Sequence, residues 1–184
     1  LQSYEFLADI DFIRAKALFA EQVKAIKPIV EDKRQMDWVR AVHPLLFLSL
    51  QKQGKQVVPL DIELTEGKRI LIISGPNAGG KSVCLKTVGL LQYMLQCGLL
   101  IPLHERSRTG IFEHIFIDIG DEQSIENDLS TYSSHLTNMK YFVKNCNERT
   151  IILIDEFGSG TEPQIGGAIA EALLDRFNRN HSFG

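Results

Sequence analysis

The eight residues from 75 to 82 have the types and the spacing of a loop that binds phosphate. In order they are Gly75, Pro76, Asn77, Ala78, Gly79, Gly80, Lys81 and Ser82. Glycines let successive backbone N–H groups curl around a phosphate, and a helix that begins near Gly80 would direct the positive end of its dipole at the same anion. A glycine-rich turn that matches by chance is the alternative. The apolar run 70–73 before the loop and the helical pattern after it favour a phosphate loop. We therefore expect a bound nucleotide, with Lys81 at its terminal phosphates and the Ser82 hydroxyl on Mg²⁺.

A pair of acidic residues, Asp155 and Glu156, could turn nucleotide binding into hydrolysis. They follow the apolar, β-branched run 150–154, which predicts a buried parallel strand. The carboxyl end of such a strand is where α/β sheets place their ligands. We expect Asp155 to hold the Mg²⁺ shell, mostly through water, and Glu156 to be the general base for the attacking water. Taken alone, both could be solvated loop carboxylates.

The surrounding elements are predicted from hydrophobic periodicity and from turn residues. A helix is expected from about residue 4 to 27, where Pro28 ends it, and a β-rich section over 29–68. Pro59 would keep a strand at 58–64 on a sheet edge, and Glu66 and Gly67 would turn the chain into the strand before the phosphate loop. A helix is expected at 80–97, followed by Gly98, and strands are expected at 114–118 and 150–154. A further helix, capped by Ser133, Ser134 or His135, would run through Asn145. The last helix would run from Pro163 to about Asn178.

Composition limits the class of protein. The 184 residues are 44% hydrophobic, enough for one full core, and the net charge of −3 argues against a nucleic-acid surface built from this segment alone. Three scattered cysteines, Cys84, Cys97 and Cys146, lack metal-ligand spacing and indicate a reducing, cytoplasmic setting. The most apolar stretch, 88–103, is interrupted by polar residues, so we expect no membrane span.

Four segments together resemble the MutS family of DNA-repair ATPases, a branch of the ATP-binding-cassette fold. They are residues 41–46 with His43 and Pro44, the phosphate loop with 85–89, the Ser-Thr-aromatic run at 130–136, and the acidic pair with 157–161. The resemblance extends from about residue 37 to 178. It implies an α/β P-loop NTPase of the ATP-binding-cassette type, with a mostly parallel sheet flanked by helices, a small antiparallel β section and an N-terminal helix. Residues 120–126 and 135–138 most resemble the bacterial MutS paralogue that lacks mismatch-reading domains. A mismatch-recognition MutS is the alternative.

The resemblance also implies roles for further residues. Gln123 is similar to the glutamine that senses Mg²⁺ and the γ-phosphate in cassette ATPases, although it could be an exposed loop residue. Ser130 and Thr131 resemble the signature that faces the nucleotide of the other subunit in a homodimer; by themselves they could be helix caps. Asn77 would hydrogen-bond to phosphate or to the partner, and the nucleotide-binding segment would extend to Val83.

One departure from the family pattern concerns the switch histidine, which cassette ATPases carry at the end of the strand after the last helix. His181 precedes the expected strand and is a poor substitute. We therefore expect residues 1–28 to be the end of a preceding helical domain, and 29–184 to be an ATPase domain that stops before this strand. DNA or a stalled ribosome would be contacted through domains absent here.

Two functions remain open at this stage. The first is an ATPase whose cycle opens and closes a dimer, and the second is a nucleotide-binding switch without useful turnover. A small-molecule kinase would need an arginine-rich lid, for which Arg106 and Arg108 are the only candidates.

Overall fold

The computed structural model describes residues 2–75, 79–120, 128–156 and 162–184, with the backbone alone for residues 2 and 128–132. Within these ranges the chain is an α/β protein whose strands form two sheets. The α/β class predicted from the sequence is confirmed. The sequence predicted a mostly parallel sheet with a small antiparallel section. In the described residues the antiparallel part is larger than expected, and β5 and β6 form a separate parallel pair.

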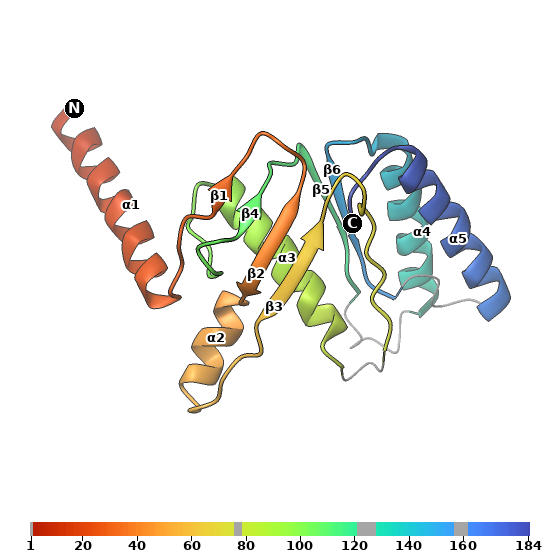
Figure 1. The fold of residues 1–184 in the computed structure, drawn as a ribbon, viewed down its shortest axis with the longest axis horizontal. Helices are drawn as coiled ribbons and strands as arrows, with labels where there is room; N and C mark the ends of the chain where they lie inside the picture. Colours follow the sequence, from red (N-terminus) through yellow and green to blue (C-terminus); the bar gives the residue numbers. More distant parts are fainter. Residues whose placement is uncertain (1, 76–78, 121–127, 157–161) are drawn as a thin grey trace.

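The larger sheet has four strands in the order β1-β4-β2-β3 (Figure 1). β1 (Ile29–Val30) is parallel to β4 (Arg108–Thr109), while β2 (Met36–Ala41) is antiparallel to both β4 and β3 (Leu60–Leu64). Trp38 in the centre of β2 is buried in the main core. β3 lies at the edge of the sheet, as Pro59 predicts, and backbone hydrogen bonds between Thr65 and Lys68 close the predicted turn.

The smaller sheet pairs β5 (His114–Asp118) with β6 (Thr150–Ile154) in parallel, at the predicted bounds. α3 (Lys81–Gln96) packs against one face of this pair. α4 (Asp128–Asn145) covers the other face and packs on α5 (Pro163–Arg179) (Figure 1). Side chains of β6 alternate accordingly, because Ile151 and Leu153 join the core beneath α3 while Ile152 packs with Phe142 of α4.

The predicted strand at 70–73 is wrong as a regular strand. Leu71 donates its N–H to the Gly184 carbonyl at 2.8 Å, and Gly184 donates to the Arg69 carbonyl at 2.9 Å, but the described residues pair no further along this segment. Ile72 consequently stays 70% exposed. The segment is extended but unpaired for most of its length, because only residues 183–184 lie between it and β6.

Two helix limits differ from the predictions, and one helix was not predicted. α1 (Gln2–Gln22) ends before Pro28 because Lys24 takes a left-handed conformation (φ 55°) and Ala25 donates to the Ala20 carbonyl, which closes the helix early. α4 begins at residue 128, so that Ser133, Ser134 and His135 lie inside the helix and do not cap it. α2 (Pro44–Gln51) was not predicted at all; it forms within the section expected to be β-rich, with Pro44 at its first position.

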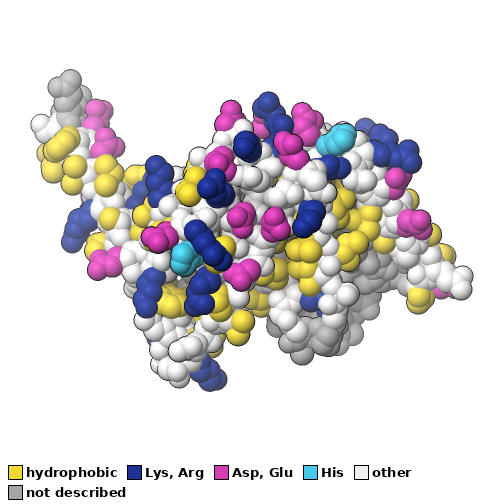
Figure 2. Space-filling model, viewed as in Figure 1, with side chains coloured by type: hydrophobic (Ala, Val, Ile, Leu, Met, Phe, Trp, Pro, Cys, Tyr) yellow, Lys and Arg dark blue, Asp and Glu magenta, His cyan; other side chains and the backbone are white. Residues whose placement is uncertain are grey.

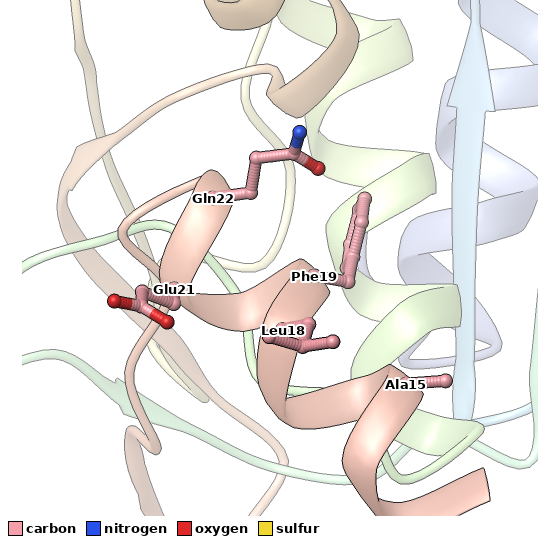
Figure 3. A pocket seen from close by; sticks show the side chains of 5 residues that line it. All are labelled: Ala15, Leu18, Phe19, Glu21 and Gln22. Atoms are coloured by element: carbon pink, nitrogen blue, oxygen red, sulfur yellow. The ribbon is translucent and has the colours of Figure 1, made fainter. Parts of the chain in front are cut away.

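The outer part of α1 projects from the body of the molecule (Figure 1) and carries apolar side chains in contact with solvent (Figure 2). Phe6, Leu7, Phe12 and Ile13 are each more than 60% exposed. Only the end of the helix is anchored, through the buried residues Ala20 and Val23. Figure 3 shows a hollow on this helix lined by Ala15, Leu18, Phe19, Glu21 and Gln22. This hollow belongs to α1, far along the chain from the phosphate loop.

Candidate nucleotide-binding site

Parallel alignment brings the phosphate loop and the acidic pair to the same edge of the protein. Phe183 forms a parallel bridge with Ile151 of β6, and Gly184 exchanges hydrogen bonds with Arg69 and Leu71 in the parallel pattern. The segment 69–74, residues 183–184, β6 and β5 therefore all run in one direction. Because the carboxyl ends of parallel strands meet at one edge, Gly75 and Asp155 both emerge there.

The described part of the loop has the backbone that its glycines permit. Gly75 (φ 149°) and Gly80 (φ 84°) both take positive φ, and Gly80 is the N-cap residue of α3. Lys81 opens the helix and donates from Nζ to the Gly75 carbonyl oxygen at 2.6 Å. The side chain of Lys81 thus reaches back to the first residue of the loop. The predicted ligands Pro76, Asn77 and Ala78 lie outside the described residues, whereas Gly79, Ser82 and Val83 lie at the start of α3 or directly before it.

Close packing of α3 against the parallel strands sets the position of the loop. A Cβ atom built on Gly89 would lie 3.1 Å from Cδ1 of Ile117 and 3.1 Å from Cδ1 of Leu153, so that a larger residue would require these side chains to shift. Buried Val88 and Leu91 flank this contact. The helix N-terminus, with its positive dipole end, is therefore held at the edge where the strands end.

Asp155 and Glu156 differ in burial and in backbone conformation. Asp155 is 7% exposed, its N–H donates to the Asp118 carbonyl oxygen at 2.9 Å, and its Oδ1 accepts the N–H of Glu156 at 3.1 Å. Glu156 is exposed and takes a left-handed conformation with φ 51°, which is unfavourable for a residue that has a Cβ atom. Strain of this kind is often found where a side chain is directed for function.

A further polar cluster at the same edge was missed by the sequence analysis. The carboxylate of Asp118, at the end of β5, accepts a hydrogen bond from Nδ2 of Asn138 at 2.8 Å and lies 2.5 Å from Nδ1 of His135. We call these three residues the Asp118 cluster. The signal was present in the sequence, since an acidic residue ends the run 114–118 and two polar residues at i and i+3 share one helix face.

The remaining predicted site residues are only partly placed. Gln123 lies outside the described residues, as do residues 157–161 after the acidic pair. Ser130 and Thr131 belong to the first turn of α4, where the backbone alone is described. They precede His135 and Asn138 on the same helix.

His43 of the His-Pro segment has a local structural role next to α3. Its Nδ1 accepts the N–H of Leu46 at 3.4 Å and so caps α2. Burial, together with the positive charge of Lys86 on α3, lowers the pKa of His43 below its usual 6.5. The imidazole is consequently held neutral, which is the form that can accept this hydrogen bond.

In the part of the chain that the structure describes, no three His, Cys, Asp or Glu side chains converge as a metal site. None of the helices in those ranges is long and apolar enough to cross a membrane.

The fold and this edge define an α/β domain in which a glycine-rich loop with a lysine and an acidic pair follow parallel segments. Residues 71–183 match the family model described as MutS domain V. The chain is 48% identical over 175 residues to the endonuclease MutS2 of Shouchella clausii, and 48% identical over 178 residues to the putative endonuclease MutS2 of Bacillus subtilis. These alignments cover 95% and 97% of the chain. The endonuclease MutS2 of Levilactobacillus brevis is 44% identical over 183 residues, the whole of the chain.

The chain belongs to the MutS family. The resemblance to the paralogue branch without mismatch-reading domains is confirmed, since these relatives are MutS2 proteins. The chain spans 22% of the length of each of these three relatives.

Proposed function

We propose that this chain is the ATP-binding and ATP-hydrolysing domain, of the ATP-binding-cassette type, of a MutS2-like protein. The observation that carries the proposal is the parallel alignment of segment 69–74, residues 183–184 and β6, which brings Gly75 and Asp155 to one edge. Nucleotide hydrolysis needs two parts at one edge of the protein, namely a phosphate loop and a strand that ends in acidic residues.

Binding of the phosphates falls to the loop and to the start of α3. Backbone N–H groups of residues 75–83 and the positive end of α3 attract the phosphate oxygens. Lys81 exchanges its hydrogen bond with the Gly75 carbonyl for charge-assisted hydrogen bonds to the terminal phosphates. This exchange keeps the ammonium group solvated or hydrogen-bonded throughout the cycle.

The residues present fit a Mg²⁺ ion that is bound together with the nucleotide. Mg²⁺ is usually held by one or two protein oxygens, phosphates and several waters, and the Ser82 hydroxyl with the buried Asp155 carboxylate supplies such oxygens. When bound, the ion would neutralise charge on the β- and γ-phosphates. Asp155 is already oriented by its backbone hydrogen bond to Asp118, so its carboxylate needs little rearrangement.

Hydrolysis would use Glu156 as the general base. The carboxylate orients the attacking water and accepts its proton, while Gln123 senses the γ-phosphate. Ser130 and Thr131 contact the nucleotide of a second subunit, so that ATP completes a homodimer interface and its hydrolysis loosens it. In this proposal the nucleotide cycle drives conformational switching of the dimer.

The partner of the whole protein is proposed to be DNA, branched or mismatched, or a stalled ribosome, in the cytoplasm. Residues 29–184 would supply the ATPase domain, and residues 1–28 the end of a preceding helical domain. The exposed apolar side chains of α1 support the second assignment, because a helix with apolar residues on several faces needs packing partners. Target contacts would lie in parts of the protein outside this chain.

A second candidate function is a nucleotide-binding switch without useful turnover. It is favoured by the exposed segment 71–73, which pairs with the described residues only through Gly184. A phosphate loop whose leading segment is loosely held would bind nucleotide but position it poorly against Glu156.

Phosphate release in the presence of ATP and Mg²⁺ distinguishes these functions. The proposed ATPase predicts a measurable rate that falls by roughly 10²–10⁴-fold in Glu156→Gln, with ATP affinity kept or increased. Glu171→Gln, an exposed glutamate of α5, is the matched control and should retain the wild-type rate. Tight ATP binding with no rate above that of Glu156→Gln would support the switch instead.

A further inference from the structure

Asp118 uses both oxygens of its carboxylate to hold one helix. Oδ1 accepts a hydrogen bond from Nδ2 of Asn138 at 2.8 Å, and Oδ2 lies 2.5 Å from Nδ1 of His135. The two partners are one turn apart on α4, and the carboxylate between them is 7% exposed. A buried carboxylate with two side-chain donors is a strong, directional attachment, because hydrogen bonds to a charged group are about twice as strong as those between neutral groups.

The backbone of the same residue is joined to the acidic pair. The Asp118 carbonyl oxygen accepts the N–H of Asp155, and Oδ1 of Asp155 in turn accepts the N–H of Glu156. A continuous series of hydrogen bonds therefore connects His135 on α4 to the proposed general base. In this series, Asp118 is the one residue that links α4 to Asp155.

Apolar packing does not attach the amino-terminal half of α4 in the same way. In the second half of the helix, Met139 and Phe142 are buried against Ile152 of β6. Of the side chains from residue 133 to 138, His135 alone is half-buried and the other five are exposed. The Asp118 cluster thus joins this part of the helix to the sheet edge through two side-chain hydrogen bonds.

His135 also lies against the point where the chain leaves β5. With the Nδ1 proton on the Asp118 side, Nε2 faces the backbone of Gly120, where a Cβ atom would be 3.6 Å away. The imidazole therefore contacts Asp118 at the end of β5 and lies near Gly120, two residues further along the chain.

We propose that Asp118, with His135 and Asn138, is a positioning unit that fixes the first turns of α4 relative to Asp155 and Glu156. Those turns carry Ser130 and Thr131, so the unit couples the trans signature to the hydrolytic edge. Loss of the unit slows the hydrolytic step and leaves nucleotide binding by the phosphate loop in place. The coupling to hydrolysis rests on the proposed ATPase function; the attachment of α4 does not.

The test measures the attachment and the coupling separately in this chain. Amide hydrogen exchange is followed for residues 133–138 and 139–145 without nucleotide, and kcat and KM for ATP are measured under steady-state or single-turnover conditions. His135→Ala should raise exchange in 133–138, but not in 139–145, and lower kcat, each by about tenfold, because a hydrogen bond to a buried charge is lost. KM for ATP should change by less than about threefold, since the loop is untouched.

Two matched variants distinguish a positioning role of His135 from general destabilisation of α4. His135→Asn places an amide donor near the position of Nδ1 and should restore both readouts. Thr137→Ala removes a hydrogen bond to the Ser133 carbonyl in the same turn, without touching Asp118, and should leave both unchanged.

The exchange measurement tests the attachment of α4, and the kinetic measurement tests its coupling to hydrolysis. Unchanged exchange in 133–138 of a folded His135→Ala protein overturns the attachment. A wild-type kcat in that protein, or no recovery in His135→Asn, overturns the coupling. If wild-type turnover does not depend on Glu156, the proposed ATPase function fails, the coupling fails with it, and the exchange result still decides the attachment.

Discussion

The backbone N–H of Asp155 donates to the carbonyl oxygen of Asp118 at 2.9 Å, one residue beyond the pairing of Asp118 with Ile154. The β5–β6 ladder thus continues up to the acidic pair. Asp155 is therefore placed by the sheet itself, before any nucleotide binds. Glu156, the next residue, leaves the ladder in a left-handed conformation and is exposed. One acidic residue is held rigidly and the other is turned outward, which suits a metal ligand followed by a base.

Lys81→Ala should weaken ATP binding by at least about tenfold, because a charge-assisted hydrogen bond to phosphate is worth roughly 1.5–3 kcal/mol. The fold should persist, since Lys81 belongs to neither hydrophobic core cluster and its ammonium group donates to the Gly75 carbonyl of the loop. Isothermal titration with ATP and Mg²⁺, combined with a thermal melt, measures both. Lys140→Ala, an exposed lysine of α4, serves as the control. Wild-type affinity in a folded Lys81→Ala protein would exclude the phosphate-loop assignment.

Glu156→Gly should be more stable than Glu156→Ala by about 1 kcal/mol, since a Cβ atom is unfavourable at φ 51°. At an ordinary position the order would be the reverse, because glycine is the more flexible residue in the unfolded chain. Both variants should lose hydrolysis. Urea denaturation of the two proteins provides the comparison. If the alanine variant proves the more stable, the left-handed conformation is not the native one in solution.

Gly89→Ala should leave the protein less stable than Gly167→Ala by about 1–3 kcal/mol, because the new methyl group would crowd Ile117 and Leu153 between α3 and the strands. Gly167→Ala is the matched substitution in α5, where nothing lies within 4 Å of the new Cβ, and it should stabilise by about 0.5–1 kcal/mol. Equal effects of the two substitutions on the free energy of unfolding would contradict the close packing of α3.

Stability should depend on pH through His43. Its pKa is lower in the folded protein than the usual 6.5, so between these two values the unfolded chain binds more protons. The contribution of His43 to stability is therefore complete above pH 6.5 and is lost as the pH falls toward the folded pKa. Protonation also removes the acceptor that caps Leu46.

Two variants test that assignment by thermal melts from pH 7.5 to 5. His43→Asn retains a side-chain acceptor for the cap and should flatten the pH dependence attributable to this residue. Lys86→Gln removes the nearby charge and should make the loss of stability on acidification smaller, because the pKa of His43 rises toward its usual value. An unchanged profile in both would assign the pH dependence to other groups.

Local patterns in the sequence were sufficient for the chemistry and for most elements. The glycines and the lysine of the phosphate loop, the acidic pair, and the bounds of β5 and β6 follow from residue type and spacing within a few positions. Gly98 ends α3 in a positive-φ conformation as predicted. Membership of the MutS family followed from the order of four short motifs. These features are set by interactions within one turn or one strand, so that a linear pattern contains them.

Tertiary structure decided the features that depend on distant pairs. Segment 69–71 lies beside residue 184, and Asp118 meets His135 and Asn138 across 17 and 20 positions. Serines that favour caps locally lie inside α4, where helical spacing lets His135 and Asn138 reach the same carboxylate. Likewise, the apolar run after Pro44 became a helix instead of a strand. Each of these outcomes depends on which groups, distant in sequence, are buried together. A local stretch of sequence does not contain that information, because the free energy of burial depends on both partners.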